Sequence, residues 1–242
     1  MTPLRIRLAA AVLGAGLVLA APAAAFAGPL RPTGPTSSVA PTDRTIDSVR
    51  ARCQDAITKR LTALGQASAK LPQAKELTPE HKAALDSIIS ETTARLEALQ
   101  PKIAGDTDPA TLKADCQSIF LDNRVFALVL PRTRLVVGAD AAAAAAGRLD
   151  EVAGKLEQAI AKAEAAGQDV TQAKADLESM RDKIDAARSS VSGIPESILG
   201  LTPADWNANH EVLTPARESL RSARDGLKEA RDLARQIAGE LR

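Results

Sequence analysis

The chain has 242 residues, with 31 Lys and Arg against 30 Asp and Glu, and only 2% of it is aromatic. The near-zero net charge argues against a non-specific nucleic-acid binder, which needs a basic excess. The scarcity of aromatic residues removes the stacking platforms on which bases bind, while the 45% apolar and 25% charged fractions are typical of a globular protein.

The N-terminal segment has the pattern of an export signal. Arg5 and Arg7 form a positive segment, residues 8–21 are apolar, and residues 25–27 (Ala-Phe-Ala) offer a signal-peptidase site. We expect residues 1–27 to be a signal peptide cleaved after Ala27, with cleavage after Ala23 or Ala25 as the alternative. An uncleaved anchor is disfavoured because the apolar run is shorter than the roughly 20 residues of a spanning helix. The protein is therefore expected to be secreted or associated with the cell envelope.

Residues 28–42 are rich in Pro and are expected to form a disordered leader. Beyond it, apolar residues recur at spacings of three and four, which predicts helices. The first helix carries Ile46 to Leu71 and is stopped by Pro72. The second starts at Thr78-Pro79 and ends at Pro101 and Gly105. The third starts at Asp108-Pro109, and its inward residues are predicted to be Leu112, Cys116, Ile119 and Phe120.

Cys53 and Cys116 are the two cysteines of the chain. If the first three helices run up, down and up, both cysteines lie at the same height on parallel helices. Because an exported protein meets an oxidising compartment, we expect a disulfide between them, worth about 4 kcal/mol in the chain-entropy model. Two buried free thiols are the alternative, and a zinc site would need further ligands.

The stretch 125–137 admits two interpretations. Residues 125–130 are apolar on every side, Pro131-Arg-Thr-Arg134 follows, and residues 135–137 are apolar again. A buried helix kinked at Pro131 is favoured because helices flank it on both sides. A β-hairpin is the alternative because β-branched residues are frequent. In either case we expect this to be the most buried segment of the mature chain.

The second half predicts long helices with many alanines at their buried positions. One helix runs from about 133 to 166, and Gly167 with the capping-box pattern of 169–172 predicts a turn. One continuous helix is the alternative. A second helix covers 170–191, a connector covers 193–201, and a last helix begins at Thr214-Pro215.

The expected fold is therefore all-α, an elongated bundle of about six helices in coiled-coil-like antiparallel hairpins. We expect a three-helix unit at 43–131 that contains the disulfide, and a long helical hairpin plus a C-terminal helix at 132–242.

Residues that carry chemistry are sparse. His81 and His210 are the two histidines, and both are expected on polar surface. Neither a zinc-protease pattern nor a nucleophile elbow is present. We expect no enzyme activity, no catalytic or metal-binding residues, no cofactor and no small-molecule substrate.

Two segments are candidates for interaction. Trp206, in the connector 201–210, is a candidate anchor for a partner or a glycan. The competing interpretation pairs it with Leu201 in a hydrophobic staple around a capping box at Thr202 and Asp205. Arg124, Arg132 and Arg134 surround the apolar segment and are candidates for binding an anionic envelope polymer or lipid head groups. Their competing interpretation is snorkelling from a buried helix.

Three short strings carry a resemblance: residues 163–171 (AEAAGQDVT), 201–207 (LTPADWN) and 125–131 (VFALVLP), followed by an Arg- and Ala-rich last helix. With the Ala-rich export signal, they resemble alanine-rich secreted helical proteins of actinobacteria. No biochemical activity is assigned to that group, so the resemblance implies no functional residue. The leading hypothesis is a non-catalytic structural or protein-interaction protein that binds a partner protein or itself. The alternative is a surface binder of membrane or anionic cell-wall polymer.

Overall fold

The structure is a computed structural model in which residues 46–241 are described, and these belong to one compact unit, Asp43–Arg242. The predicted signal peptide, its cleavage site and the leader lie outside the described residues. Within them all regular structure is helical, which confirms the all-α prediction. The elements are α1 (Ile46–Lys70), a 3₁₀ turn η1 (Leu71–Gln73), α2 (Pro79–Gly105), α3 (Pro109–Leu121), a π-helical turn η2 (Val125–Val129), α4 (Leu130–Ala165), α5 (Thr171–Ser192), α6 (Ile194–Leu199), α7 (Pro203–Ala208) and α8 (Thr214–Glu240).

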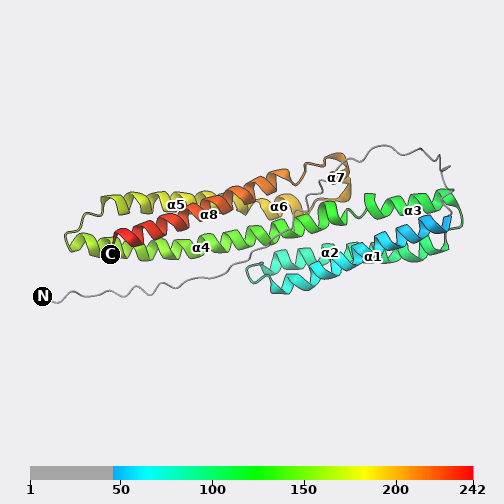
Figure 1. Cartoon of the computed structure of the whole chain (residues 1–242), viewed down its shortest axis with the longest axis horizontal. Coiled ribbons are helices and arrows are strands. Elements are labelled where there is room, and N and C mark those ends of the chain that lie inside the picture. The colour runs from blue at the N-terminus through cyan, green and yellow to red at the C-terminus, as the bar shows by residue number, and fades with distance from the viewer. Residues whose placement is uncertain (1–45, 242) are drawn as a thin grey trace, which may run out of the picture. The chain divides into compact units, whose positions relative to one another are not determined.

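Helices α1, α2 and α3 pack against one another as a first bundle, in which α1 and α3 run in the same direction (Figure 1). Cys53 and Cys116 are joined by a disulfide with 5.6 Å between their Cα atoms, which confirms the predicted pairing. The core between the helices is aliphatic. Its fully buried residues include Ile57, Leu64, Leu85, Leu96, Leu112 and Ile119.

The predicted helix starts are confirmed by their caps. The Thr78 hydroxyl accepts from the His81 N–H, and the Asp108 carboxylate accepts from the Thr111 N–H. The end of α2, predicted at Pro101 and Gly105, is confirmed at Gly105, and the helix continues through Pro101. Past Pro101, Ile103 is fully buried and its carbonyl accepts from Arg50 Nε, so core packing and a capping guanidinium hold the last turn.

The stretch 125–137 is helical, so the β-hairpin alternative is wrong. In the turn η2 the Val129 N–H donates to the Arg124 carbonyl five residues earlier. A proline has no N–H, and its ring clashes with the carbonyl four residues before it. The π-helical turn η2, which is wider than an α-helical turn, lies just before Pro131, the residue at which we predicted a kink. Val125, Leu128 and Val129 are buried, but Phe126 is 52% exposed, so this apolar segment is not buried on every side.

Helices α4, α5 and α8 form a second bundle, with α5 antiparallel to the other two (Figure 1). Gly167, at φ +82°, makes the turn between α4 and α5, so the hairpin is confirmed and the continuous helix is wrong. The capping box at 169–172 does not form, because α5 begins at Thr171 with Val170 at the N-cap position, and the Asp169 carboxylate accepts from the Thr171 N–H instead. The boundary proposed at 131/132 lies inside the first turn of α4, which reaches from one bundle into the other.

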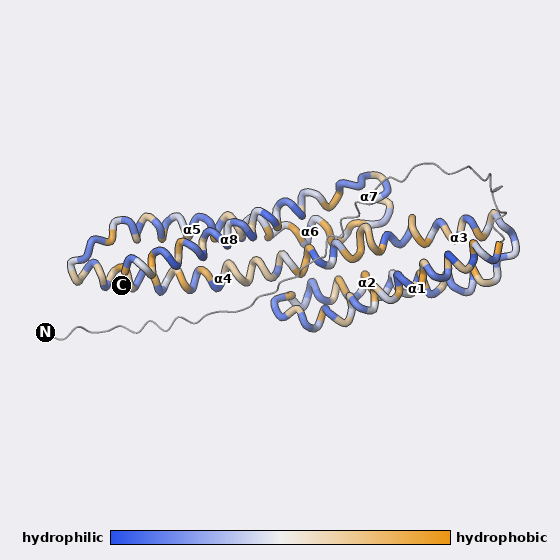
Figure 2. The backbone as a smooth tube through the Cα atoms, in the orientation of Figure 1, coloured by the Kyte–Doolittle hydropathy of each residue, from blue (hydrophilic) through white to orange (hydrophobic). Residues whose placement is uncertain are grey.

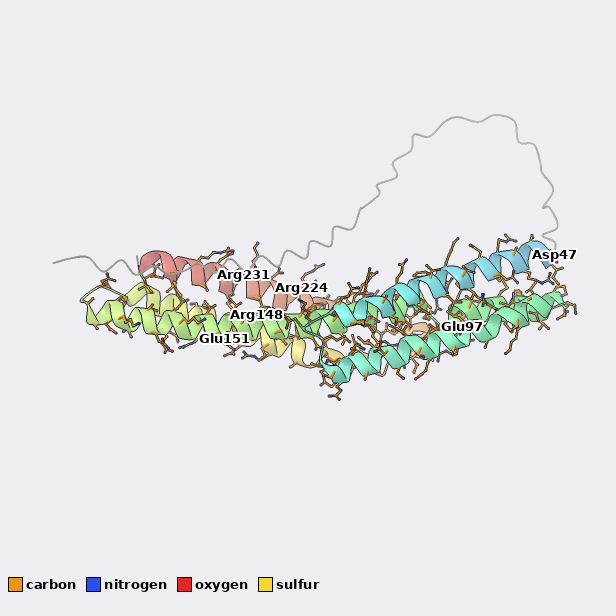
Figure 3. The ribbon with its side chains drawn as sticks, turned by 90° about the horizontal axis from the view of Figure 1, so that it is seen from below. Asp47, Glu97, Arg148, Glu151, Arg224 and Arg231 are labelled. Carbon is orange, nitrogen blue, oxygen red and sulfur yellow. A yellow bond between two sulfur atoms is a disulfide. The ribbon has the colours of Figure 1, made fainter. Side chains whose placement is uncertain are left out.

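Small residues let the second bundle pack closely. A Cβ on Gly138 in α4 would lie 2.8 Å from Leu220 Cδ2 in α8, so the glycine makes room for the Leu220 side chain between the two helices. Apolar and polar positions alternate along every long helix (Figure 2). No helix in the described part is long and apolar enough to span a membrane. Charged side chains cover the outer faces of both bundles, as labelled in Figure 3 for Asp47, Glu97, Arg148, Glu151, Arg224 and Arg231.

Candidate interaction surface at the turn between α3 and α4

The turn that links α3 to α4 has an unusual backbone. Arg124 adopts φ 37° and ψ 38°, a left-handed conformation that is uncommon for residues other than Gly, Asn and Asp. The buried Asn123 next to it donates from Nδ2 to the Ser118 carbonyl and so ends α3. The tight turn therefore rests on specific hydrogen bonds, and it separates the last turn of α3 from the π-helical turn.

Two phenylalanines flank this turn at the surface. Among the described residues the exposed large apolar side chains are Phe120 at 44%, Leu121 at 44% and Phe126 at 52%. Both rings share one cation, because Arg60 Cζ lies 4.3 Å from the Phe120 centroid and 5.3 Å from that of Phe126. Partial burial lowers the pKa of Arg60. We call Arg60, Phe120, Leu121 and Phe126 the aromatic patch.

The disulfide sets the register that brings the patch together. Phe120 follows Cys116 by one helical turn, and Arg60 follows Cys53 by about two. Because α1 and α3 run in the same direction, both residues lie on the same side of the disulfide. Helical side chains lean toward the N-terminus, which lets the long Arg60 side chain reach back over the ring of Phe120.

The connector that carries Trp206 packs beside the same turn. Asn207 accepts from Arg124 Nε at 2.6 Å and donates to the Leu121 carbonyl at 3.1 Å. The predicted capping box between Thr202 and Asp205 is present at the start of α7. Trp206 is partly buried against the core, and its ring stacks on His210 at 5.7 Å between centroids. The two segments singled out from the sequence therefore meet, and a role for Trp206 as an anchor stays a prediction.

The three arginines singled out from the sequence do not form one surface cluster. Arg134 is exposed and Arg124 is partly exposed, but Arg132 is only 4% exposed. Its Nη1 donates to the carbonyls of Leu199 and Leu201 at the end of α6. Arg132 therefore neither snorkels nor lies at the surface. Its guanidinium stays buried because it donates to these carbonyls, and the C-terminal end of a helix carries a partial negative charge. Binding through Arg124 and Arg134 stays a prediction.

His81 is not a free surface histidine, contrary to expectation. Its Nδ1 lies 2.9 Å from both carboxylate oxygens of Asp140, which is buried in α4. The same carboxylate accepts from the Thr78 N–H at 2.9 Å. Asp140 therefore holds the N-terminus of α2 against α4, and the side-chain pair ties the first bundle to the second.

The sequence pattern missed two of the four residues in the aromatic patch, Arg60 and Leu121, and misplaced the two phenylalanines. Phe120 was expected to point inward because it follows Ile119 in an apolar run, and Phe126 because its whole segment is apolar. A helix at the surface of a bundle buries only one face. In these two runs the aliphatic neighbours, such as Ile119 and Leu128, occupy the buried face and the phenylalanines stay exposed. The predicted disulfide was a usable signal, because Arg60 follows Cys53 by about two helical turns and Phe120 follows Cys116 by one.

No family model, curated protein or solved structure matches this chain. The resemblance to actinobacterial secreted proteins therefore stays a prediction. Within residues 46–241 no group of three or more His, Cys, Asp or Glu is placed to hold a metal ion. The geometry thus defines an all-α, disulfide-linked helical protein with one exposed aromatic patch, and its function is argued from that patch.

Proposed function

We propose that this protein is an exported, non-catalytic helical protein that binds another polypeptide through the aromatic patch. The observation that carries the proposal is the exposure of Phe120 and Phe126 around one guanidinium, with the exposed Leu121 next to Phe120 in the chain, in a protein with 2% aromatic residues. Exposed apolar side chains that cluster mark interaction sites, whereas single ones are ordinary. Aromatic residues and Arg are also the residue types enriched at the centres of protein interfaces.

Export is supported by the N-terminal pattern of the sequence and by the disulfide between Cys53 and Cys116. The disulfide is also part of the site, because it fixes the register of α1 against α3 on which the patch depends. A partner that buries the two rings would desolvate Arg60, so a carboxylate opposite Arg60 would strengthen the contact. We therefore expect a partner surface that combines apolar side chains with Asp or Glu.

The alternative, binding to membrane or an anionic wall polymer, rests on Arg124, Arg132 and Arg134. It is the weaker proposal because Arg132 donates to two carbonyls inside the protein. Liposome and cell-wall co-sedimentation distinguishes the two. The alternative would replace the proposed function if the double variant Arg124→Ala, Arg134→Ala no longer sedimented with liposomes or cell wall while Phe126→Ser still did.

The direct test compares two substitutions in the mature protein, Phe126→Ser and Trp206→Ser, by retention of partners from envelope extract. Phe126 is more than half exposed, so its replacement should leave the unfolding temperature nearly unchanged while the retained partner is lost. Trp206 is the competing anchor, and its substitution should leave retention intact in protein that remains folded. Retention that is unaffected by Phe126→Ser would overturn the proposal.

A further inference from the structure

A second feature of the same region is a hollow of about 150 Å³ behind the turn, between α2, the start of α4 and the α6–α7 connector. Half of its lining residues are apolar, with Ile88, Leu128 and Leu201 among them, and the other half are polar or charged. Two cations line it: Arg132, which is buried, and Arg95, which is exposed. The hollow therefore combines an apolar wall with two positively charged side chains.

The guanidinium of Arg132 is held in a fixed orientation with one edge unused. Its Nη1 donates to the carbonyls of Leu199 and Leu201 at 3.1 and 2.6 Å. Its Nε is buried and has no hydrogen-bond partner, and none of the described residues accepts from Nη2. Nε and Nη2 form the edge with which a guanidinium binds two oxygens of one carboxylate or phosphate.

The charge on Arg132 is also uncompensated. No carboxylate among the described residues forms an ion pair with Arg132 or Arg95. Burial and, to a smaller extent, the charge of Arg95 lower the pKa of Arg132 to about 10. Glu91 lines the hollow, but its carboxylate accepts from the Ser87 hydroxyl at 2.7 Å. A buried charge with neither a counter-charge nor its full set of hydrogen bonds is costly, and a bound anion would remove both defects.

We propose that this hollow binds a small organic carboxylate with a short apolar substituent, whose two oxygens accept from the free edge of Arg132 while Arg95 closes the site. A carboxylate fits better than a bare phosphate because Ile88, Leu128 and Leu201 offer contacts to hydrocarbon. The polar lining residues Thr92, Asn123 and Thr202 already donate to other groups of the protein, so they offer little to further oxygens. The volume limits the ligand to a few carbon atoms beyond the carboxylate. The site differs from the aromatic patch in both residues and ligand class.

The experiment is an NMR titration of the mature protein with butyrate at constant ionic strength, followed at the Arg132 Nε–H resonance. Butyramide, of the same shape without the charge, and inorganic phosphate are the comparison ligands. Butyrate should shift the resonance saturably, butyramide should not, and phosphate should bind more weakly than butyrate.

Two variants identify the residues involved. Arg95→Gln removes the charge at the exposed edge, where Arg95 also donates to Asn123 Oδ1 and to the Thr92 hydroxyl. In variant protein that thermal unfolding shows to be folded, the substitution should weaken butyrate binding about tenfold. Arg231→Gln removes the same charge from an exposed position in α8 and should change nothing. The proposal is overturned if butyrate gives no saturable shift, or if butyramide shifts the resonance equally. It is also overturned if phosphate binds more tightly than butyrate, or if the two variants have equal effects.

Discussion

The guanidinium carbon of Arg60 lies 4.3 Å from the ring centroid of Phe120, one helical turn beyond the disulfide that joins their two helices. The covalent link, the cation–ring contact and the exposed phenylalanines therefore belong to one structural unit. Fixing the register of α1 against α3 aligns the fully buried Ile57 with Ile119 inside the bundle and places the rings outside it. This relationship connects the stability of the first bundle with the surface proposed to bind a partner.

Removing the disulfide should lower the free energy of unfolding substantially. The bond closes a loop with a sequence separation of 63 residues, so the chain-entropy model gives a loss of about 4 kcal/mol for Cys53→Ser with Cys116→Ser. Urea unfolding followed by circular dichroism measures it, with reduced wild-type protein as the matched control. If both samples unfold at the urea concentration of the oxidised protein, the disulfide does not stabilise the bundle.

Two glycines of α4 should respond in opposite directions to the same substitution. At Gly138 the new Cβ would lie 2.8 Å from Leu220, so Gly138→Ala should destabilise the protein by about 1–3 kcal/mol through overpacking. At the exposed Gly147 a Cβ meets nothing within 4 Å, so Gly147→Ala should stabilise by about 0.5–1 kcal/mol through helix propensity. Thermal unfolding of both variants tests the close approach of α4 to α8. A neutral effect of Gly138→Ala would mean that the two helices lie further apart.

His81 and Asp140 should be energetically coupled. The carboxylate of Asp140 is shared between the His81 ring and the Thr78 N–H, so Asp140→Ala should cost about 1–3 kcal/mol because buried donors lose their acceptor. His81→Ala should cost less, since the ring is the more exposed partner. A double-mutant cycle should give a coupling energy of about 0.5 kcal/mol or more. Strict additivity of the two substitutions would show that the pair does not hold α2 against α4.

Acid should weaken the cap of α3. Hydrogen bonds from the Thr111 N–H and hydroxyl lower the pKa of Asp108. A lowered folded-state pKa stabilises the protein above the unfolded-state value, near 3.9, and this stabilisation is lost as the pH falls through the folded-state value. Asp108→Asn keeps an acceptor that does not titrate. The difference in unfolding temperature between wild type and Asp108→Asn should therefore favour wild type at neutral pH and shrink below pH 4. A difference independent of pH would contradict the capping role.

The sequence was sufficient for the helices and the disulfide because these depend on local signals. Thr78-Pro79 and Asp108-Pro109 encode helix starts, Gly167 encodes a turn, and the spacing of two cysteines on parallel helices encodes their pairing. Pro101 does not end α2, although a proline usually ends or kinks a helix. The last turn is held by the burial of Ile103 and by the hydrogen bond from Arg50 to its carbonyl, and these contacts come from distant parts of the chain. Tertiary contacts of this kind are invisible to a local pattern.

The candidate site was predicted less well for the same reason. Phe120 and Phe126 each have aliphatic neighbours that could equally have been the exposed ones, and only the three-dimensional register decides which residues stay outside. Arg132 sits in a segment with Arg124 and Arg134, but the end of α6, which accepts its hydrogen bonds, is remote in sequence. Its burial follows from a helix end that the sequence predicts only as a connector.

Photo-crosslinking in intact source cells tests the central proposal most directly. A benzophenone amino acid replaces Phe126 in one sample and Arg231, an exposed residue of α8, in the other, and the adducts are analysed by mass spectrometry. The account predicts a discrete protein adduct from position 126, which is lost when Phe120→Ser is added, and none from position 231. Equal labelling from both positions, or no protein adduct at 126, would contradict it.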